Sequence, residues 1–437
     1  MDTSISSAQL YERAVKLIPH GTHSDSRTRK PYPRYFVRAE GAWVVDADGN
    51  RFLDCIMGNG AVMLGHAFPS VIHAVQRQVE TGLGAGLEGE LSVTVAEQFL
   101  AHVHTAEHVR FTNTGTEASM HAIAMARAYT GKNDIAKPEG SYHGWSDFLF
   151  VSAFPDPRSA GPAESPVSLP GSGGMHPAGV ASTLVLPFND IPNTEALLRR
   201  NATRLAAVIV EPVMIDIGWV PATPEYLRSL RELTRELNIM LIFDELLTGL
   251  RFEEGSAQQR YGITPDLSTF GKALGNGFII AAVAGSAGPM ASMQPNGNRS
   301  SYVGTFNSHQ TSLAASSAVL EALAGGDVAR QLAKRTAWLI SEFDHCARKL
   351  GRAAVMVGDG GHFHWYFREH APTNYREVWT SDAKAYEVFA QALAKSGVLC
   401  APTYIQHHAL SIAHGDKELT FLAEAMHKGL NQVAALS

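Results

Sequence analysis

A single lysine stands in the otherwise uncharged stretch LSTFGKALGNGF, residues 267–278. Lysine is among the residues least often buried, because its ammonium group must lose its hydration. Lys272 is therefore either an ordinary lysine, with its stem on apolar surface and its charge in water, or an amine nucleophile whose pKa is lowered by its surroundings. Residues elsewhere in the chain decide between the two interpretations.

Two short apolar runs, AAVIVEP at 206–212 and IMLIFDE at 239–245, each end in an acidic residue. Between them, Pro224 can open a helix, and four leucines fall on one face of it: Leu227, Leu230, Leu233 and Leu237. This strand–helix–strand order predicts parallel strands in a sheet that is covered on both faces. Both acids then lie at the carboxyl edge of the sheet, where ligands bind in open α/β folds.

Asp244, at the end of the second run, is expensive to bury unless a cation or hydrogen-bond donors meet it. A structural salt bridge is one explanation, and a charge partner for the protonated ring nitrogen of a ligand is the other. Lys272 follows after enough chain for one more helix and strand of the same sheet. The sequence thus allows the acid and the amine to share one site.

The run FTNTGTEASMHAIAMARAYTG, residues 111–131, predicts a turn of small residues that leads into a helix. Thr114, Gly115 and Thr116 precede this Ala- and Met-rich helix, whose N-terminal N–H groups and dipole attract phosphate. The alternative is a threonine N-cap with no ligand. A second small hydroxyl-bearing turn, with Thr305 in YVGTFNSHQ, is also able to reach a phosphate.

The turn GSYHGW carries Tyr142 and His143 between glycines. Tyr142 can stack on a planar ligand or pack against the sheet. Pyridoxal 5'-phosphate needs a lysine for its Schiff base, an anion at its pyridinium nitrogen, a phosphate cradle and flat apolar groups on its ring faces. Taken together, Lys272, Asp244 and the two turns supply these features and predict a site for this cofactor.

On these motifs the chain resembles the class III pyridoxal-phosphate-dependent aminotransferases of fold type I, and within them the glutamate-1-semialdehyde 2,1-aminomutase-like branch. The resemblance runs from PHGTHSDSR at 19–27 to CAPTYIQHHALSIAH at 400–414. It implies an α/β fold whose large domain has a mainly parallel seven-stranded sheet, with a smaller α+β domain built from both termini. The implied boundaries are 1–55 for the N-terminal part of the small domain, 56–315 for the large cofactor-binding domain and 316–437 for the C-terminal part.

The resemblance also implies a role for each motif residue. The catalytic set is Lys272 as the Schiff-base lysine, Asp244 as the pyridinium partner and Tyr142 on one ring face, with Leu246 opposite. The full cofactor-binding set is Thr114, Gly115, Thr116, Tyr142, His143, Asp216, Asp244, Leu246, Lys272 and Thr305. Thr305 reaches the phosphate from the neighbouring subunit, which implies an obligate homodimer with shared active sites.

On the substrate side, the resemblance assigns Arg27, with Ser24 beside it, to a substrate carboxylate, which an arginine can bind through two hydrogen bonds. Gln406 stands where the branch has an acid, and Asp216 where it has an asparagine near the phenolic oxygen of the cofactor. A carboxylate beside a phenolate is repulsive unless one of them carries a proton. The Pro-, Gly- and Ser-rich loop 155–179 matches the position of the branch's gating loop.

Three functions are open on this basis. The leading prediction is an aminotransferase that moves an amino group between a carboxylate-bearing amino compound and a keto acid or aldehyde. The alternatives are an intramolecular aminomutase of the glutamate-1-semialdehyde type and a catalytically silent fold-type-I binding protein. Among the 19 histidines, His362 and His364 would share one face of a strand and His407 and His408 are adjacent. Neither pair has a further ligand nearby, so no metal site is predicted.

The composition is that of an ordinary globular protein, with 45% hydrophobic and 18% charged residues among 437. A net charge of −6 without a basic stripe argues against nucleic acid as a partner. No apolar run approaches the roughly 18 residues of a membrane span. The three cysteines, Cys55, Cys346 and Cys400, form no CxxC pair, and the N-terminus has no apolar signal segment. These features predict a soluble, cytoplasmic protein, and the resemblance implies a small-molecule amino substrate.

Overall fold

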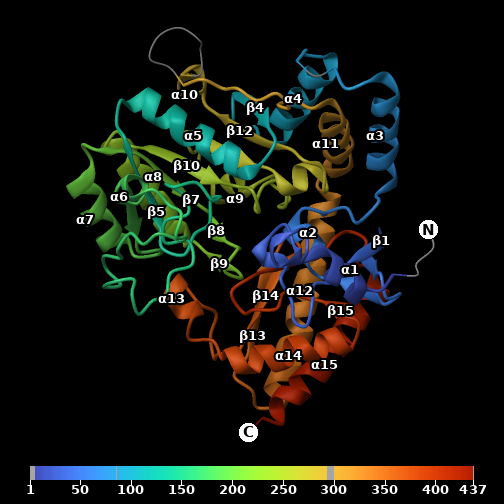
Figure 1. Cartoon of the computed structure of the whole chain (residues 1–437). Helices are drawn as coiled ribbons and strands as arrows, with labels where there is room; N and C mark the ends of the chain where they lie inside the picture. Colours follow the sequence, from blue (N-terminus) through green and yellow to red (C-terminus); the bar gives the residue numbers. More distant parts are fainter. Residues whose placement is uncertain (1–4, 85, 293–299, 437) are drawn as a thin grey trace.

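The structure is a computed structural model, which describes residues 5–84, 86–292 and 300–436 (Figure 1). Its large domain contains a seven-stranded sheet in the order β4-β12-β11-β10-β7-β5-β6. The strands are β4 (His108–Thr112), β5 (Asp134–Pro138), β6 (Thr183–Leu186), β7 (Leu205–Val210), β10 (Met240–Asp244), β11 (Leu267–Phe270) and β12 (Ala281–Gly285). All neighbouring pairs are parallel except those of β12, which runs antiparallel to β11 and β4. The predicted mainly parallel seven-stranded sheet is confirmed.

The predicted strand–helix–strand unit is formed by β7, α8 (Pro224–Glu236) and β10. Thr223 caps α8 by accepting a hydrogen bond from the backbone N–H of Tyr226, and proline occupies the first turn, where its missing N–H costs nothing. Three of the four predicted leucines are buried, whereas Leu237 is the C-cap residue. Both strands are fully buried, as expected for strands between two layers of helices.

Helix α5 (Gly115–Thr130) begins just after β4. Thr114 is its N-cap residue and accepts a hydrogen bond from the N–H of Glu117, whose carboxylate accepts one from the N–H of Thr114 in return. Gly115 and Thr116 therefore lie within the first helical turn, whereas the sequence had placed them before the helix. The helix stops at Gly131, whose φ of 69° is a left-handed conformation that favours glycine.

The alternation of side chains along β12 shows how the sheet is covered on both faces. Ala281 and Val283 belong to the apolar cluster that contains the buried residues of α5. Ala282 and Ala284 belong to the cluster that contains residues of α3 (Pro69–Thr81), α4 (Glu90–His102) and α11 (Gln310–Leu323). Since successive residues of a strand point to opposite faces, these two sets of helices lie on opposite sides of the sheet.

Short elements connect the strands of the large domain. They are α2 (Met57–Gly60), α6 (Pro177–Ala181), α7 (Ile191–Asn201), α9 (Ala257–Tyr261), α10 (Ala287–Ala291), the 3-10 turn η3 (Lys272–Gly275) and the ribbon of β8 (Val213–Met214) and β9 (Val220–Pro221). The segment 155–179, predicted as a loop, contains no helix until α6 begins at Pro177.

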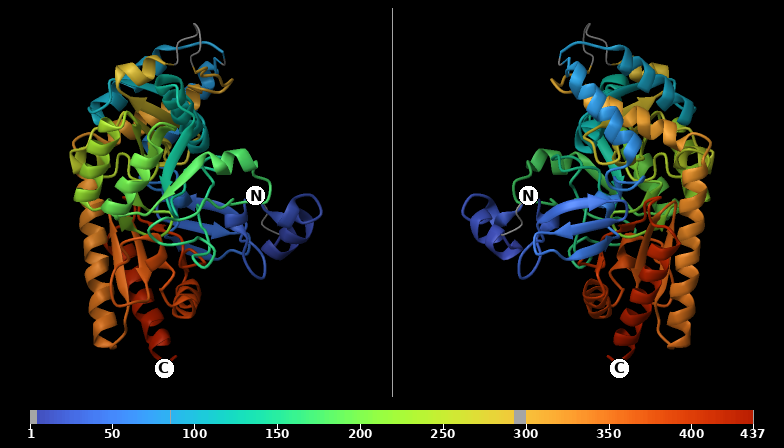
Figure 2. Two further views of the ribbon diagram at one scale, coloured as in Figure 1. Left: turned by 90° about the vertical axis from the view of Figure 1, so that its left-hand side faces the viewer. Right: turned by 90° about the vertical axis from the view of Figure 1, so that its right-hand side faces the viewer.

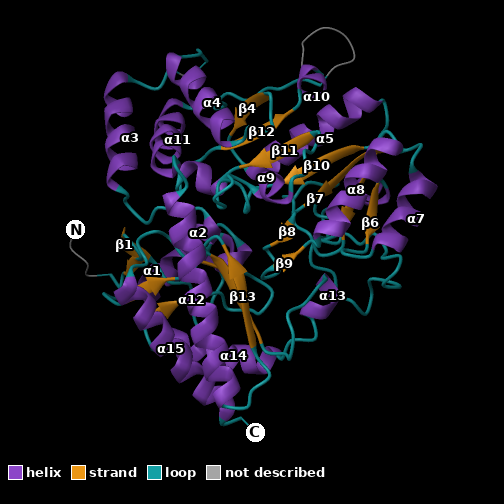
Figure 3. Cartoon of the chain, turned by 180° about the vertical axis from the view of Figure 1, so that it is seen from behind, coloured by secondary structure: helices purple, strands orange, loops and turns teal. Residues whose placement is uncertain are grey.

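Both ends of the chain build the small domain, which lies below the large sheet in Figure 1. One sheet joins β1 (Phe36–Glu40), β2 (Trp43–Asp46) and β3 (Arg51–Asp54) to β15 (Val398–Leu399), and Leu53 pairs in parallel with Val398. The other contains β13 (Val355–Asp359), β14 (His362–Tyr366) and β16 (His408–Ala409). The helices are α12 (Asp327–Lys349), α13 (Tyr375–Val378), α14 (Ala383–Lys395) and α15 (Asp416–Ala434), of which α14 and α15 lie near the C-terminus in the view from behind (Figure 3). The predicted α+β domain is confirmed; its boundaries at residues 55 and 315 stay predictions.

The N-terminal segment stands away from the rest of the molecule in both side views of Figure 2. It contains α1 (Ser7–Ala14) and the 3-10 turns η1 (Pro19–Gly21) and η2 (Asp25–Arg27). Leu17, between α1 and η1, is 83% exposed, although it is a large apolar side chain. Within the described ranges, no helix combines the length and the apolar character needed to cross a membrane.

Candidate active site

Four strand ends bring the predicted residues to one edge of the large sheet. β10 ends at Asp244, and β11 ends two residues before Lys272. β5 leads into the turn that carries Tyr142, and β4 leads into α5. These four strands run in the same direction, so their carboxyl ends lie together. This is the edge at which open α/β folds bind their ligands.

Asp244 is held by a buried histidine. His143 donates a hydrogen bond from Nδ1 to the Oδ2 of Asp244 at 2.7 Å, and the Leu246 N–H donates to Oδ1 at 3.1 Å. Burial lowers the pKa of His143, and its hydrogen bond to Asp244 opposes that shift. The Nε2 of His143 is buried and has no partner among the described residues. A neutral imidazole thus orients the carboxylate of Asp244, and its hydrogen bond offsets the hydration free energy that this carboxylate loses on burial.

Lys272 lies at a strained position of the backbone. Its φ is 46°, in the left-handed region that only glycine adopts without cost. Such a conformation costs about 1–3 kcal/mol and persists where the surrounding structure imposes it. The Nζ atom donates a hydrogen bond to the carbonyl oxygen of Asn59 at 3.1 Å. The side chain therefore turns toward the sheet edge and meets a peptide carbonyl there, rather than extending into water as an ordinary surface lysine does.

Asp216, in the connection between β8 and β9, lies near Lys272 and His407. Its Oδ1 is 3.4 Å from the Nδ1 of His407, and its side chain is 21% exposed. Burial tends to raise the pKa of Asp216, but the charge of Lys272 and then the contact with His407 outweigh burial and hold the pKa below its usual value. His407, a residue that the sequence did not assign to the site, is thus the side chain that holds Asp216.

The ring of Tyr142 is held by two phenylalanines. It stacks on Phe154 with ring centroids 6.0 Å apart and planes 21° apart, and it meets the edge of Phe150. Burial raises the pKa of the Tyr142 hydroxyl, with further contributions from the charges of Asp216 and Asp244. The ring thus lies within reach of both carboxylates, and its hydroxyl stays protonated at neutral pH.

Three glycines allow the Lys272, α5 and Tyr142 segments to meet. A Cβ on Gly115 would lie 2.6 Å from Leu246 Cδ1, and one on Gly271 would lie 2.7 Å from Leu246 Cδ2. Gly144, with φ at +98°, faces Thr116, and a Cβ there would lie 2.6 Å from Thr116 Oγ1. Any larger residue would fill the space in front of the α5 N-terminus, where backbone N–H groups favour an anion.

The residues fit pyridoxal 5'-phosphate in charge and in shape. Lys272 supplies an amine, Asp244 a carboxylate of fixed direction, and the start of α5 an anion site that a Cβ would close. The unpartnered Nε2 of His143 leaves buried hydrogen-bonding capacity at the same edge. No separate structural task of the fold requires these groups together.

Comparison with known proteins agrees with this geometry. The sequence profile of the family described as "Aminotransferase class-III" matches residues 24–433. The chain belongs to the class-III aminotransferases. The glutamate-1-semialdehyde 2,1-aminomutase of Ignicoccus hospitalis is 35% identical over 438 residues, which cover 99% of this chain and 100% of the relative. The enzyme of the same name from Thermomicrobium roseum is 36% identical and covers 98% of both chains.

Solved structures of transaminases give the same result. An omega-transaminase from Sphaerobacter thermophilus matches with a TM-score of 0.93 and 35% identity, over 99% of this chain and 98% of that chain. A structure described as a transaminase with PLP bound matches with a TM-score of 0.89 and 30% identity, over 98% of both chains. The predicted fold type, the enzymatic class, the cofactor pyridoxal 5'-phosphate and a small-molecule amino substrate are confirmed.

Four predicted residues of this class-III site lie apart from its centre. Arg27 is exposed, and Ser24 bonds to Ser26 Oγ at 2.9 Å. Thr305 is exposed, on the segment whose Asn307 bonds to Asn113. Among the described residues, no hydrogen bond or ion pair joins Ser24, Arg27, Thr305 or Gln406 to Lys272 or Asp244. Their roles stay predictions.

Several residues at the site were not assigned to it from the sequence. They are Asn59, Lys137, Glu211 and His407. Glu211 and Lys137 could have been recognised from the sequence, because each is a charged residue in an otherwise apolar strand context. No sequence feature pointed to Asn59. The histidines considered for a metal, His362, His364, His407 and His408, are all buried, and two of them, His364 and His408, pack against aromatic side chains of the small domain.

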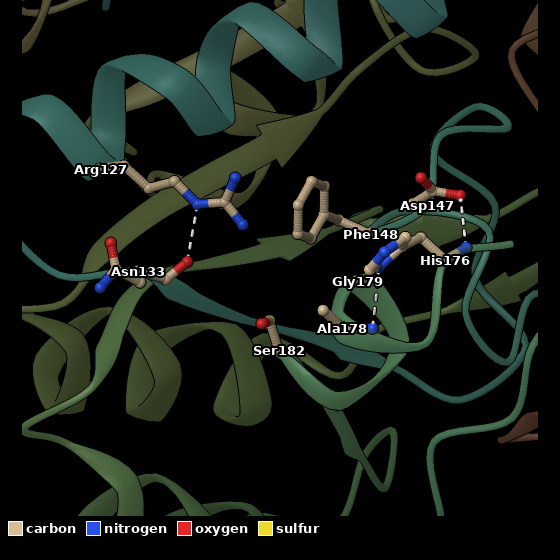
Figure 4. Close-up of a pocket in the computed structure, with 8 residues that line it drawn as sticks. All are labelled: Arg127, Asn133, Asp147, Phe148, His176, Ala178, Gly179 and Ser182. Atoms are coloured by element: carbon tan, nitrogen blue, oxygen red, sulfur yellow. Dashed lines mark hydrogen bonds between the residues drawn. The ribbon is translucent and has the colours of Figure 1, made fainter.

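The pocket drawn in Figure 4 is separate from this site. It has a volume of about 360 Å³ and is lined by residues that include Arg127, Asn133 and Ser182. Asn133 and Ser182 immediately precede the starts of β5 and β6, and Arg127 lies in the last turn of α5. The pocket therefore opens at the amino edge of these strands, opposite the edge that carries Asp244 and Lys272.

Proposed function

We propose that this class-III enzyme is an aminotransferase that carries its cofactor on Lys272 and moves an amino group between a carboxylate-bearing amino compound and a keto acid or aldehyde. The observation that carries the proposal is a pair of groups at one sheet edge. Asp244 is fixed in direction by His143 at 2.7 Å, and the Lys272 nitrogen donates to a peptide carbonyl rather than to a carboxylate. A salt bridge between Asp244 and Lys272 would contribute only to stability. Because each group is instead oriented by its own partner, both remain able to bind a ligand.

Lys272 has two tasks in this proposal. Pyridoxal 5'-phosphate held by Lys272 would supply an electron sink for the charge left on the substrate Cα when its proton is removed. The ε-amine of Lys272 would remove that proton and return it. The Asn59 carbonyl orients the amine, and His407 holds the Asp216 side chain nearby.

The other residues hold and orient the cofactor. Asp244 keeps a proton on the ring nitrogen, and His143 keeps Asp244 in place. Tyr142 and Leu246 cover opposite ring faces and exclude water. The phosphate binds at the α5 N-terminus, to the set Thr114, Gly115, Thr116 and Thr305, the last from the neighbouring subunit. Arg27, Ser24 and Gln406 face the substrate, and Gln406 is supported by its place beside His407.

An intramolecular aminomutase is the second candidate. It is favoured by the name that the curated relatives share at 34–36% identity over nearly the whole chain. It would use the same residues and retain the reacting molecule behind the segment 155–179. Asp216 and Gln406 depart from the branch on the substrate side, which favours the aminotransferase.

A half-reaction screen tests the proposal. Purified holoenzyme is mixed with single amino compounds, without an acceptor, and the visible absorbance of the cofactor and the products are followed. We expect an amino donor to bleach the visible band and to release one equivalent of keto acid or aldehyde per site, because the amino group stays on the enzyme. Repeated conversion of one substrate into its isomer without an acceptor would instead establish the aminomutase. An enzyme that no amino compound bleaches or isomerises would contradict both.

We also propose that two copies of the chain share their active sites. Large apolar side chains near the site are exposed in the single chain: Trp145 at 73%, Ile279 at 68%, Val303 at 77% and Phe306 at 59%. Such a concentration of apolar surface favours burial against another protein. The three free cysteines support the cytoplasm as the compartment.

Light scattering should therefore give about twice the chain mass of 47.1 kDa. Phe306→Asp should shift the protein toward the monomer and reduce activity, because it places a charge in the proposed interface. Trp338→Asp is a matched control, since Trp338 is exposed at 40% on α12 in the small domain. A fully active monomer would contradict the shared site.

A further inference from the structure

The peptide group that joins Ser141 to Tyr142 is bound at both ends by buried charged side chains. Lys137 Nζ donates a hydrogen bond to the carbonyl oxygen of Ser141 at 2.7 Å. The N–H of Tyr142, which belongs to the same peptide group, donates to Glu211 Oε1 at 3.1 Å. The amine donor thus lies at the carbonyl end of the peptide group and the carboxyl acceptor at its N–H end. This arrangement fixes the plane of the peptide.

Lys137 and Glu211 each form a hydrogen bond with a second segment of the chain as well. Lys137 also donates to the carbonyl of Val151, where the chain returns from the turn. The other oxygen of Glu211 accepts a hydrogen bond from the N–H of Ile215 at 3.2 Å. Ile215 immediately precedes Asp216. By accepting hydrogen bonds from both Tyr142 and Ile215, Glu211 therefore holds the turn that carries Tyr142 at a fixed distance from the segment that carries Asp216.

Stability does not explain these two residues. Lys137 is 0% exposed and Glu211 is 4% exposed, and neither can be buried without a large loss of hydration. Apolar side chains of similar size are often neutral or stabilising in such places. Among the described residues no ion pair joins Lys137 directly to Glu211, because each side chain binds the peptide group between them. Lys137 and Glu211 instead orient the Ser141–Tyr142 peptide group.

We propose that Lys137 and Glu211 are positioning residues that fix the Ser141–Tyr142 peptide, and through it the ring of Tyr142 and the imidazole of His143. His143 in turn orients Asp244. The inference rests on the proposed function, since it assigns a purpose to the pair only if Tyr142 and Asp244 contact the cofactor. It extends that function to two residues outside the predicted site.

Lys137→Met and Glu211→Gln test the inference in the holoenzyme. Methionine keeps the length of lysine without its donors, and glutamine has one acceptor oxygen for two backbone N–H groups. We expect each variant to lower kcat by about ten- to a hundredfold with little change in KM, because the cofactor rather than the substrate is displaced. The circular dichroism of the cofactor band should weaken in parallel, which a purely structural role would not cause.

Lys132→Met is the matched control. Lys132 also donates to backbone carbonyls, those of Ala202, Leu237 and Asn238, but it precedes β5 at the opposite edge of the sheet. We expect it to change the melting temperature and leave kcat and the cofactor band as they are. If Lys132→Met and Lys137→Met have the same effect on kcat and dichroism, the positioning role is wrong.

The double variant Lys137→Met/Glu211→Gln measures whether the two residues act on one peptide. If they do, the combined loss of kcat should be clearly smaller than the product of the two single losses. Independent, multiplicative losses would overturn the inference. A wild-type protein that shows no cofactor band at all would overturn the proposed function instead, so the two failures are distinguishable.

The pH dependence of stability gives a further readout. Burial lowers the pKa of Lys137 to about 7, and the charge of Glu211 opposes this shift; His143 is the other titratable group that interacts with Lys137. A lysine in the unfolded chain keeps its proton to about pH 10.4, so between the two values the unfolded state binds more protons. Wild-type melting temperature should therefore rise relative to Lys137→Met as the pH increases from 7 to about 10. A constant difference over this range would contradict the buried amine of Lys137 on which the inference depends.

Discussion

Lys272→Ala should yield a folded protein that can no longer bind its cofactor covalently. After treatment with borohydride and digestion, mass spectrometry should find a pyridoxyl group on the Lys272 peptide of the wild type and none on the variant. Activity should fall by at least about a thousandfold, because both the imine and the general base are lost. Stability should hardly change, since alanine at a φ of 46° carries the same backbone strain as lysine.

The control for this substitution is Lys384→Ala. Lys384 is exposed and paired with Glu387 at 2.9 Å, far from the sheet edge on α14. It should keep both the label at Lys272 and the activity of the wild type. A labelled, active Lys272→Ala enzyme would show that another lysine carries the cofactor and would remove the basis of the proposed mechanism.

Asp244→Asn should separate covalent attachment from catalysis. The amide oxygen can still accept the hydrogen bond of His143, so the cofactor should still be found on Lys272 after borohydride treatment. The amide has no charge with which to keep a proton on the ring nitrogen, so kcat should fall by about a hundred- to a thousandfold. The measurement is kcat together with the labelled fraction.

Asp266→Asn is a suitable control for Asp244→Asn. Asp266 precedes β11 at the opposite edge of the same sheet and accepts hydrogen bonds from the Leu241 N–H and from Arg231. Its substitution should lower the melting temperature while kcat stays unchanged. If Asp244→Asn keeps the kcat of the wild type, Asp244 is structural and the ring nitrogen is not protonated by it.

The centre of the site was predictable because the fold is built from local units. Pro224, the leucines of α8 and two apolar runs define a βαβ unit, and the parallel connection then places Asp244 at the carboxyl edge. Lys272 follows after the next strand of the same sheet. These positions follow from chain order alone, which a sequence contains.

The surroundings of the site were not predictable in the same way. His407 reaches Asp216 from the far end of the chain, and Asn59 reaches Lys272 from the beginning of the large domain. Such contacts depend on how the small domain packs against the large one. The orientation of the Ser141–Tyr142 peptide depends on two side chains from β5 and from the end of β7, and no local pattern encodes it.

The pairing of β3 with β15 also affects the order in which the enzyme can be assembled during translation. The small-domain sheet cannot close until Val398 has been synthesised and pairs with Leu53. By that point the large domain has already left the ribosome. His407 lies just beyond β15, so its contact with Asp216 is also among the last to form. The contact that positions Asp216 from the small domain therefore forms only after the C-terminal part of that domain has been synthesised.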